Sequence, residues 1–62
     1  MPVVTVDWIE GRSKEQKQQI TKAITDALVN IGKARVEGVT IVFNDHSREH
    51  WASGGQLLAD KK

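Results

Sequence analysis

The sequence predicts an α+β fold in which a βαβ subunit, with two parallel strands and one long helix, is followed by a C-terminal hairpin. Two β-branched runs, residues 3–9 and 39–43, flank a segment whose apolar residues recur at helical spacing. A strand, a helix and a strand in this order form a βαβ unit, whose crossover makes the strands parallel and is right-handed. No repeat or linker interrupts the chain, so residues 1–62 are expected to form a single domain.

The first strand, residues 3–9, is apolar on both faces. One face carries Val4, Val6 and Trp8, and the other carries Val3, Thr5, Asp7 and Ile9. Apolar groups on both sides are typical of parallel strands that are covered by helices or by another subunit.

The helix is expected to begin at Lys14, because Ser13 and Gln16 have the spacing of a capping box. An apolar stripe follows and is interpreted as core. Its members are Ile20, Ala23, Ile24, Ala27, Leu28 and Ile31. The polar face comprises Lys17, Gln18, Thr21, Lys22, Thr25 and Asp26. Gly32 is predicted to end the helix in a left-handed conformation.

The second strand, residues 39–43, again carries apolar residues on both faces. Since one helix covers one face of the two strands, the other face requires a second chain. Residues 44–50, which follow this strand, are polar, and Gly54-Gly55 is interpreted as the centre of a hairpin, because glycine tolerates positive φ. A lone hairpin is marginal in water, so this one is expected to dock on a neighbouring subunit. Residues 60–62 are expected to fray.

Length and composition favour association and exclude several function classes. A chain of 62 residues without cysteine buries only about 60% of its unfolded surface and has no disulfide to support it. A net charge of +1 with dispersed lysines argues against nucleic acid as a partner. No signal peptide or membrane span is visible, so we expect a cytoplasmic protein. Nothing in the sequence indicates a cofactor or a metal.

The segment His46 to His50 fits the H-x-x-E-H pattern of zinc peptidases. That chemistry needs a stable helix and a third ligand, and Asp60 is the sole acid after Trp51. Two surface histidines in a turn are the preferred interpretation. Trp51 itself is either an interface anchor or the apolar wall of a pocket, and composition leaves both open.

Pro2 becomes a secondary amine if the initiator methionine is removed. Burial and a nearby guanidinium, such as that of Arg12 beside the Gly-Ser helix start, disfavour the cationic form of this amine and make it a base near neutral pH. The structural alternative is that Pro2 merely starts an edge strand, where its missing N–H costs nothing. Retention of Met1 would leave an amide nitrogen that cannot transfer protons.

The chain resembles the 4-oxalocrotonate tautomerase family, the short-chain members of the tautomerase superfamily that have an amino-terminal proline. The resemblance rests on Pro2, Glu10-Gly11-Arg12-Ser13, Glu15-Gln16-Lys17, the βαβ pattern, His50-Trp51 and Gly54-Gly55, and it runs essentially end to end. It implies dimers with four-stranded sheets that assemble into homohexamers, with hetero-hexamers as an alternative. It also implies a keto-enol isomerase of small 2-oxo acids, of the kind used in aromatic hydrocarbon catabolism.

Carried over by the resemblance, Pro2 is the general base and acid, and Arg12 from a neighbouring subunit holds a substrate carboxylate. Ile9 and Trp51 line the pocket. Thr40 stands where the typical enzyme has a second arginine, so activity on dicarboxylates is expected to be weak unless a partner chain, Arg35 or Arg48 supplies that charge. The alternative is a subunit that is weak or inactive without an unlike partner chain.

Overall fold

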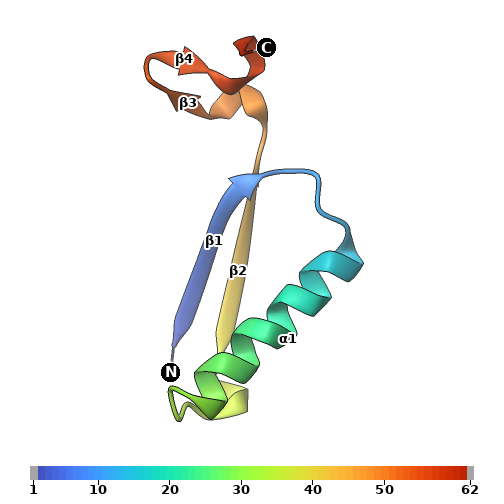
Figure 1. The fold of residues 1–62 in the computed structure, drawn as a ribbon, viewed down its shortest axis with the longest axis vertical. Coiled ribbons are helices and arrows are strands. Elements are labelled where there is room, and N and C mark those ends of the chain that lie inside the picture. Colours follow the sequence, from blue (N-terminus) through green and yellow to red (C-terminus); the bar gives the residue numbers. More distant parts are fainter. Residues whose placement is uncertain (1, 62) are drawn as a thin grey trace.

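The computed structural model describes residues 2–61, so the processing of Met1 lies outside the described residues. The two long strands are β1 (Val3–Ile9) and β2 (Thr40–His46), joined by the helix α1 (Lys14–Asn30). A hairpin of β3 (Ala52–Ser53) and β4 (Gln56–Leu57) follows. Three short 3-10 helices complete the chain: η1 (Val36–Gly38), η2 (Arg48–His50) and η3 (Leu58–Asp60). Figure 1 shows the hairpin beyond one end of the strands and the amino terminus at the other.

β1 and β2 run parallel, with Val3 opposite Thr40 and Ile9 opposite His46. The βαβ prediction is therefore confirmed, and α1 covers one face of this sheet (Figure 1). The half-buried side chains on the covered face are Val4, Val6, Trp8, Ile41 and Phe43. The exposed side chains on the open face are Val3, Thr5, Asp7, Thr40, Val42 and Asn44. Both faces of each strand thus carry apolar groups, but α1 covers only one of them.

The start of α1 follows the sequence prediction. The Ser13 hydroxyl accepts a hydrogen bond from the Gln16 backbone N–H at 3.1 Å, and the Gln16 side chain accepts one from the Ser13 backbone N–H at 2.9 Å. This reciprocal pair is the capping box and satisfies two backbone donors at the helix N-terminus.

The end of α1 differs from the prediction for Gly32. Lys33, with φ of 60°, takes the left-handed conformation, and Gly32 does not. A Cβ on Gly32 would lie 2.8 Å from the carbonyl oxygen of Leu28. Glycine is needed at position 32 because the backbone passes close to the helix end, and not because of its φ.

The apolar stripe of α1 is only partly core. One flank is half-buried against the sheet and comprises Ile20, Ile24 and Leu28. The other flank is exposed and comprises Ala23, Ala27 and Ile31, the last at 82%. Thr21 and Thr25, predicted on the polar face, are half-buried instead. Two strands about 5 Å apart are too narrow to cover the whole stripe of a helix about 10 Å wide.

The second strand extends three residues beyond its predicted end, through Asn44, Asp45 and His46. The predicted strand end at Phe43 and the turn assigned to His46 were wrong, because each of the three added residues finds a polar partner that the sequence pattern does not reveal. The hairpin is confirmed: Gly54 and Gly55 both have positive φ, 64° and 82°. Asp60, which was expected to fray, lies in η3, and the Lys61 backbone N–H donates to the Leu58 carbonyl at 3.2 Å; Lys62 lies outside the described residues.

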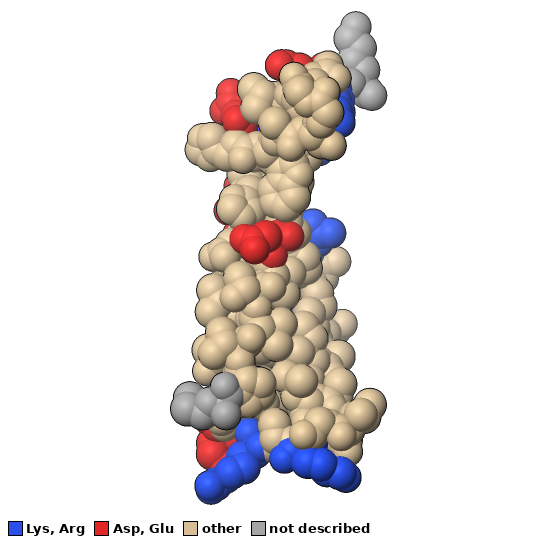
Figure 2. All heavy atoms as spheres, turned by 90° about the vertical axis from the view of Figure 1, so that its left-hand side faces the viewer, with Lys and Arg blue, Asp and Glu red and all other residues tan. Residues whose placement is uncertain are grey.

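The chain is too extended to be a self-sufficient globule. None of residues 2–61 is fully buried, and the accessible surface is 4828 Å², against about 4,000 Å² for a compact monomer of this mass. The radius of gyration is 14.8 Å, against about 11 Å for a compact domain of this length. Figure 2, seen from the β1 side, shows largely uncharged surface over the middle of the molecule. These quantities favour association with further chains.

Candidate active site

The residues with predicted roles fall into two groups at opposite ends of the sheet. Pro2 and Thr40 form the first group, in which the Thr40 backbone N–H donates to the Pro2 carbonyl at 3.0 Å. Arg35 lies in the segment before Thr40, but its Nε contacts Glu37 at 3.1 Å, which offsets its charge.

Ile9, Arg12 and Trp51 form the second group, at the carboxyl ends of β1 and β2. Ile9 lies opposite His46, whose ring centroid is 5.3 Å from that of Trp51. β1 has seven residues, and a rise of about 3.3 Å per residue separates its two ends by about 20 Å. One chain therefore does not bring Pro2 to Arg12 or to Trp51.

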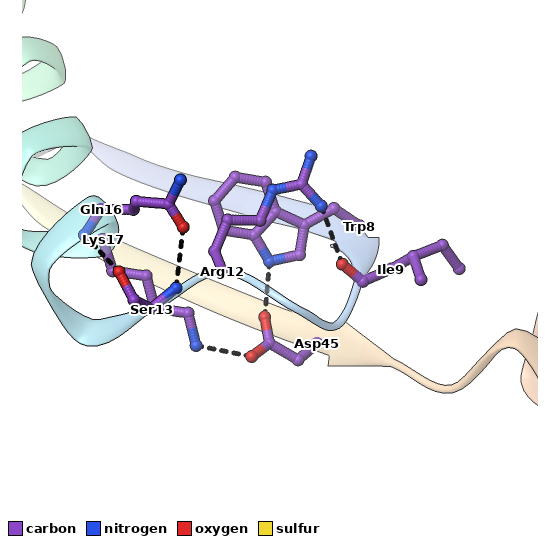
Figure 3. Close-up of polar contacts among 7 residues, drawn as sticks. All are labelled: Trp8, Ile9, Arg12, Ser13, Gln16, Lys17 and Asp45. Carbon is purple, nitrogen blue, oxygen red and sulfur yellow. Dashed lines mark hydrogen bonds and ion pairs between the residues drawn. The ribbon is translucent and has the colours of Figure 1, made fainter.

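Arg12 is held in place without losing its charge. Its guanidinium carbon lies 4.5 Å from the centroid of the Trp8 ring, and Nη1 donates to the Ile9 carbonyl at 2.9 Å. Figure 3 shows the guanidinium over the indole. Among residues 2–61, no carboxylate forms an ion pair with Arg12. A guanidinium with free donors and no acidic partner is suited to bind an anion.

The indole beneath Arg12 is itself fixed from two sides. Its ring stacks on Phe43, with centroids 5.2 Å apart and planes 16° from parallel. Its Nε1–H donates to Asp45 Oδ1 at 2.5 Å, and Lys17 Nζ donates to Asp45 Oδ2 at 2.5 Å (Figure 3). Lys17 on α1, Asp45 on β2 and Trp8 on β1 therefore form one continuous set of contacts that ends at Arg12.

The charge of Asp45 is stabilised by this network. The hydrogen bond from Lys17 and then that from Trp8 lower the pKa of the Asp45 carboxyl below its usual value. Desolvation opposes the shift, and the positive charges of Lys17 and Arg12 add to it. Lys17 is the ion-pair partner of Asp45, whereas Arg12 interacts with this carboxylate through its charge and forms no ion pair with it.

The turn that carries Arg12 depends on Gly11. Its φ of 136° lies in a region that residues with a side chain rarely adopt. The next residues form the capping box, so the glycine and the helix start together determine where the Arg12 side chain begins.

A second polar cluster was missed by the sequence reasoning. On the open face, Asp7 Oδ1 accepts a hydrogen bond from Asn44 Nδ2 at 3.1 Å and lies 3.0 Å from His46 Nε2. The two hydrogen bonds, first that of His46 and then that of Asn44, lower the pKa of the Asp7 carboxyl. The signal that could have found the cluster is the parallel register, which pairs Asp7 with Asn44.

The zinc-peptidase pattern does not lie on one helix, since His46 ends β2 and His50 lies in η2. Within residues 2–61, no group of three or more potential metal ligands is placed to hold an ion. Arg48, the other candidate for the missing charge, donates to the Leu58 carbonyl at 3.2 Å. A shallow hollow on α1, lined by Gln16, Gln19, Ile20 and Ala23, includes none of the predicted site residues.

Comparison with known proteins agrees with this architecture. The family described as "Tautomerase enzyme" matches residues 2–61. A probable tautomerase of Bacillus cereus is 38% identical over 61 residues, covering 98% of this chain and 100% of the relative. A probable tautomerase of Streptococcus pyogenes is 44% identical over 57 residues, covering 92% and 93%.

Solved structures show the same fold. The crystal structure of YwhB, a homologue of 4-oxalocrotonate tautomerase, superposes with a TM-score of 0.92 at 31% identity, covering 98% of this chain and 100% of that one. A heterohexamer 4-oxalocrotonate tautomerase from Chloroflexus aurantiacus gives 0.88 at 26% identity over the full length of both chains.

The fold and the match along the chain place it in the tautomerase class, whose members are small isomerases. Within that class, this chain belongs to the 4-oxalocrotonate tautomerase family. Membership supports a tautomerase-type activity on small molecules. Within the described part of the chain, α1 is too short and too polar to cross a bilayer, and no other helix is longer.

Proposed function

We propose that this protein interconverts the enol and keto forms of small 2-oxo acids, with the Pro2 nitrogen as the proton carrier. The observation that carries the proposal is the Arg12 guanidinium, which is held by Trp8 and the Ile9 carbonyl and has no acidic partner among residues 2–61. Such a group is ready to bind a substrate carboxylate. Family membership supports the reaction class.

The proposed reaction moves one proton and leaves the composition of the substrate unchanged. After removal of Met1, the neutral Pro2 amine takes the proton of the enol hydroxyl and returns it to a carbon of the substrate. Arg12 holds the carboxylate throughout, while Ile9 and Trp51 exclude water. Exclusion of water keeps the amine weakly basic, because a low-dielectric site disfavours its cation.

The site requires more than one copy of the chain. Pro2 and Thr40 lie at one end of the sheet and Arg12 and Trp51 at the other, so the ends of different copies must meet. Within the described chain each of β1 and β2 has one unpaired edge, and antiparallel pairing of two copies would bring such ends together. A hexamer built from these dimers is the assembly we propose, with like or unlike chains.

Thr40 defines the substrate class in this proposal. A hydroxyl donates one neutral hydrogen bond, whereas a guanidinium offers a charged bidentate contact. Loss of such a donor to developing oxyanion charge costs about 3–4 kcal/mol, or 10²–10³ in rate. Substrates with one carboxylate, such as the enol of an aryl pyruvate, should therefore be preferred over dicarboxylates.

The test is ultraviolet-monitored ketonisation of phenylenolpyruvate and of 2-hydroxymuconate, with intact mass confirming loss of Met1. We expect wild type to act faster on phenylenolpyruvate and Pro2→Ala to lose the activity. Thr40→Arg is the matched variant and should raise activity on 2-hydroxymuconate more than on phenylenolpyruvate. Equal rates for wild type and Pro2→Ala would refute the proline mechanism.

A second candidate is a subunit that needs an unlike partner chain for activity. It is favoured by the Pro2 end of the sheet, where Thr40 is uncharged and Arg35 is paired with Glu37. A processed but inactive wild-type assembly that becomes active with an arginine-bearing partner chain would support this candidate over the first.

A further inference from the structure

A histidine held by a carboxylate lies at the end of the sheet where the proposed pocket residues gather. His46 Nε2 lies 3.0 Å from Asp7 Oδ1, and the same oxygen accepts from Asn44 Nδ2 at 3.1 Å. The three residues come from adjacent positions of β1 and β2 on the open face of the sheet. The imidazole is therefore oriented by a fixed neighbour and is about one third exposed, at 34%.

The position of His46 links it to the proposed substrate pocket. In the parallel register it lies directly opposite Ile9, and its ring meets that of Trp51 edge to face at 5.3 Å. The backbone N–H of Glu10 also donates to the His46 carbonyl at 2.9 Å, which fixes the strand end. His46 is therefore a neighbour of both residues that are proposed to line the pocket.

The protonation of the ring follows from its partner. Asp7 can only accept when ionised, so Nε2 carries a proton in this hydrogen bond. Nδ1 has no hydrogen-bond partner among residues 2–61. A neutral ring with its proton on Nε2 can only accept at Nδ1, whereas the protonated ring donates from both nitrogens.

We propose that His46, oriented by Asp7, donates a hydrogen bond from Nδ1 to the 2-oxygen of the substrate as enolate charge develops there. The inference rests on the proposed function, because it places the 2-oxo acid between Ile9 and Trp51. It gives the chain a charged donor for the oxygen that Thr40 serves with a single neutral hydroxyl. His46 is thus a catalytic residue and Asp7 is its positioning residue.

Other titratable groups lie on the elements around the ring. Asp7 on β1 faces Nε2, Glu10 follows β1, and η2 carries Arg48, Glu49 and His50. Asp45, the neighbour of His46 in sequence, lies on the opposite face and pairs with Lys17.

The proposal predicts how substitutions at His46 and Asp7 change turnover. Deletion of the donor by His46→Ala should lower kcat about 100-fold, with a smaller change in KM. His46→Gln retains an amide donor, so its kcat should fall less. Asp7→Asn should lower kcat with little change in KM, because the carboxylate that orients the ring is lost.

The matched control is His50→Gln, which removes the other histidine, and its kcat should equal that of wild type. Sedimentation and circular dichroism of each variant establish that assembly and folding are retained. Equal kcat values for wild type, His46→Ala and His50→Gln would overturn the proposal.

A binding measurement separates this inference from the proline mechanism. With only two histidines, the imidazole C2–H signals can be assigned by His46→Gln and His50→Gln, even if His46→Ala fails to fold. Addition of phenylpyruvate should shift the His46 signal and leave that of His50 in place. An unshifted His46 signal, in an enzyme that Pro2→Ala inactivates, would refute the role of His46 alone. Equal activity of wild type and Pro2→Ala would instead refute the proposed function.

Discussion

Replacement of Trp8 tests whether the indole prepares Arg12 for binding. The ring lies under the guanidinium at 4.5 Å, stacks on Phe43 at 5.2 Å and donates to Asp45. Trp8→Leu removes all three contacts, whereas Trp8→Phe keeps a ring under Arg12 but removes the Nε1–H donor. The pair therefore separates the effect of the ring from the effect of the hydrogen bond.

The expected magnitude follows from the contact between Arg12 and the ring. A cation–π contact at an exposed site contributes about 0.5–1 kcal/mol, which corresponds to about two- to fivefold in KM, since about 1.4 kcal/mol is a factor of ten. Because the contact holds Arg12 equally in the ground state and the transition state, kcat should change little. Stability should fall in both variants, because both lose the hydrogen bond to Asp45, and by about 0.5–1.5 kcal/mol more in Trp8→Leu, which also loses the stacking on Phe43.

The assay is steady-state ketonisation of phenylenolpyruvate together with urea unfolding. We expect KM to rise in Trp8→Leu and to stay close to wild type in Trp8→Phe, while both unfold at lower urea. Arg12→Ala provides the upper limit for loss of the carboxylate contact. An unchanged KM in Trp8→Leu, alongside a large rise in Arg12→Ala, would refute the view that the indole positions the guanidinium.

Two further predictions concern assembly and acid stability. Wild type should sediment at micromolar concentration at several times its chain mass of 6.9 kDa. Val42→Lys, on the open face of the sheet, should sediment as smaller species, because assembly would have to bury the lysine charge between chains. Gln18→Lys, an equal charge change on an exposed position of α1, is the control, and a folded wild-type monomer would contradict the argument from surface area. The second prediction concerns Asp45, whose pKa is lowered in the folded state. Its ion pair and hydrogen bonds therefore stabilise the protein fully at pH values above the unfolded pKa of 3.8, and this stabilisation is lost as pH falls through the lower folded pKa. The melting temperature of Asp45→Asn should therefore depend less on pH below about 4 than that of wild type, and parallel acid curves for the two proteins would show that Asp45 contributes nothing.

Local patterns in the sequence were sufficient for the elements whose signals lie close together along the chain. Ser13 and Gln16 predicted the helix start, and Gly54-Gly55 predicted the hairpin turn, because capping and positive φ depend on neighbouring residues. The two-faced apolar strands predicted a need for further chains, which the extended shape supports. The family resemblance added roles for Pro2 and Arg12 that no spacing alone could supply.

The sequence by itself therefore determined the βαβ order, the helix start, the hairpin and the membership of the family. The tertiary structure alone decided which flank of α1 meets the sheet, how far β2 extends, and that Trp8 lies under Arg12. It also brought Asp7 to His46 and Trp8 to Asp45, residues 39 and 37 positions apart in the chain. The physical reason is that parallel pairing joins residues across a crossover helix, and their register depends on packing between the strands and that helix, which no local spacing encodes.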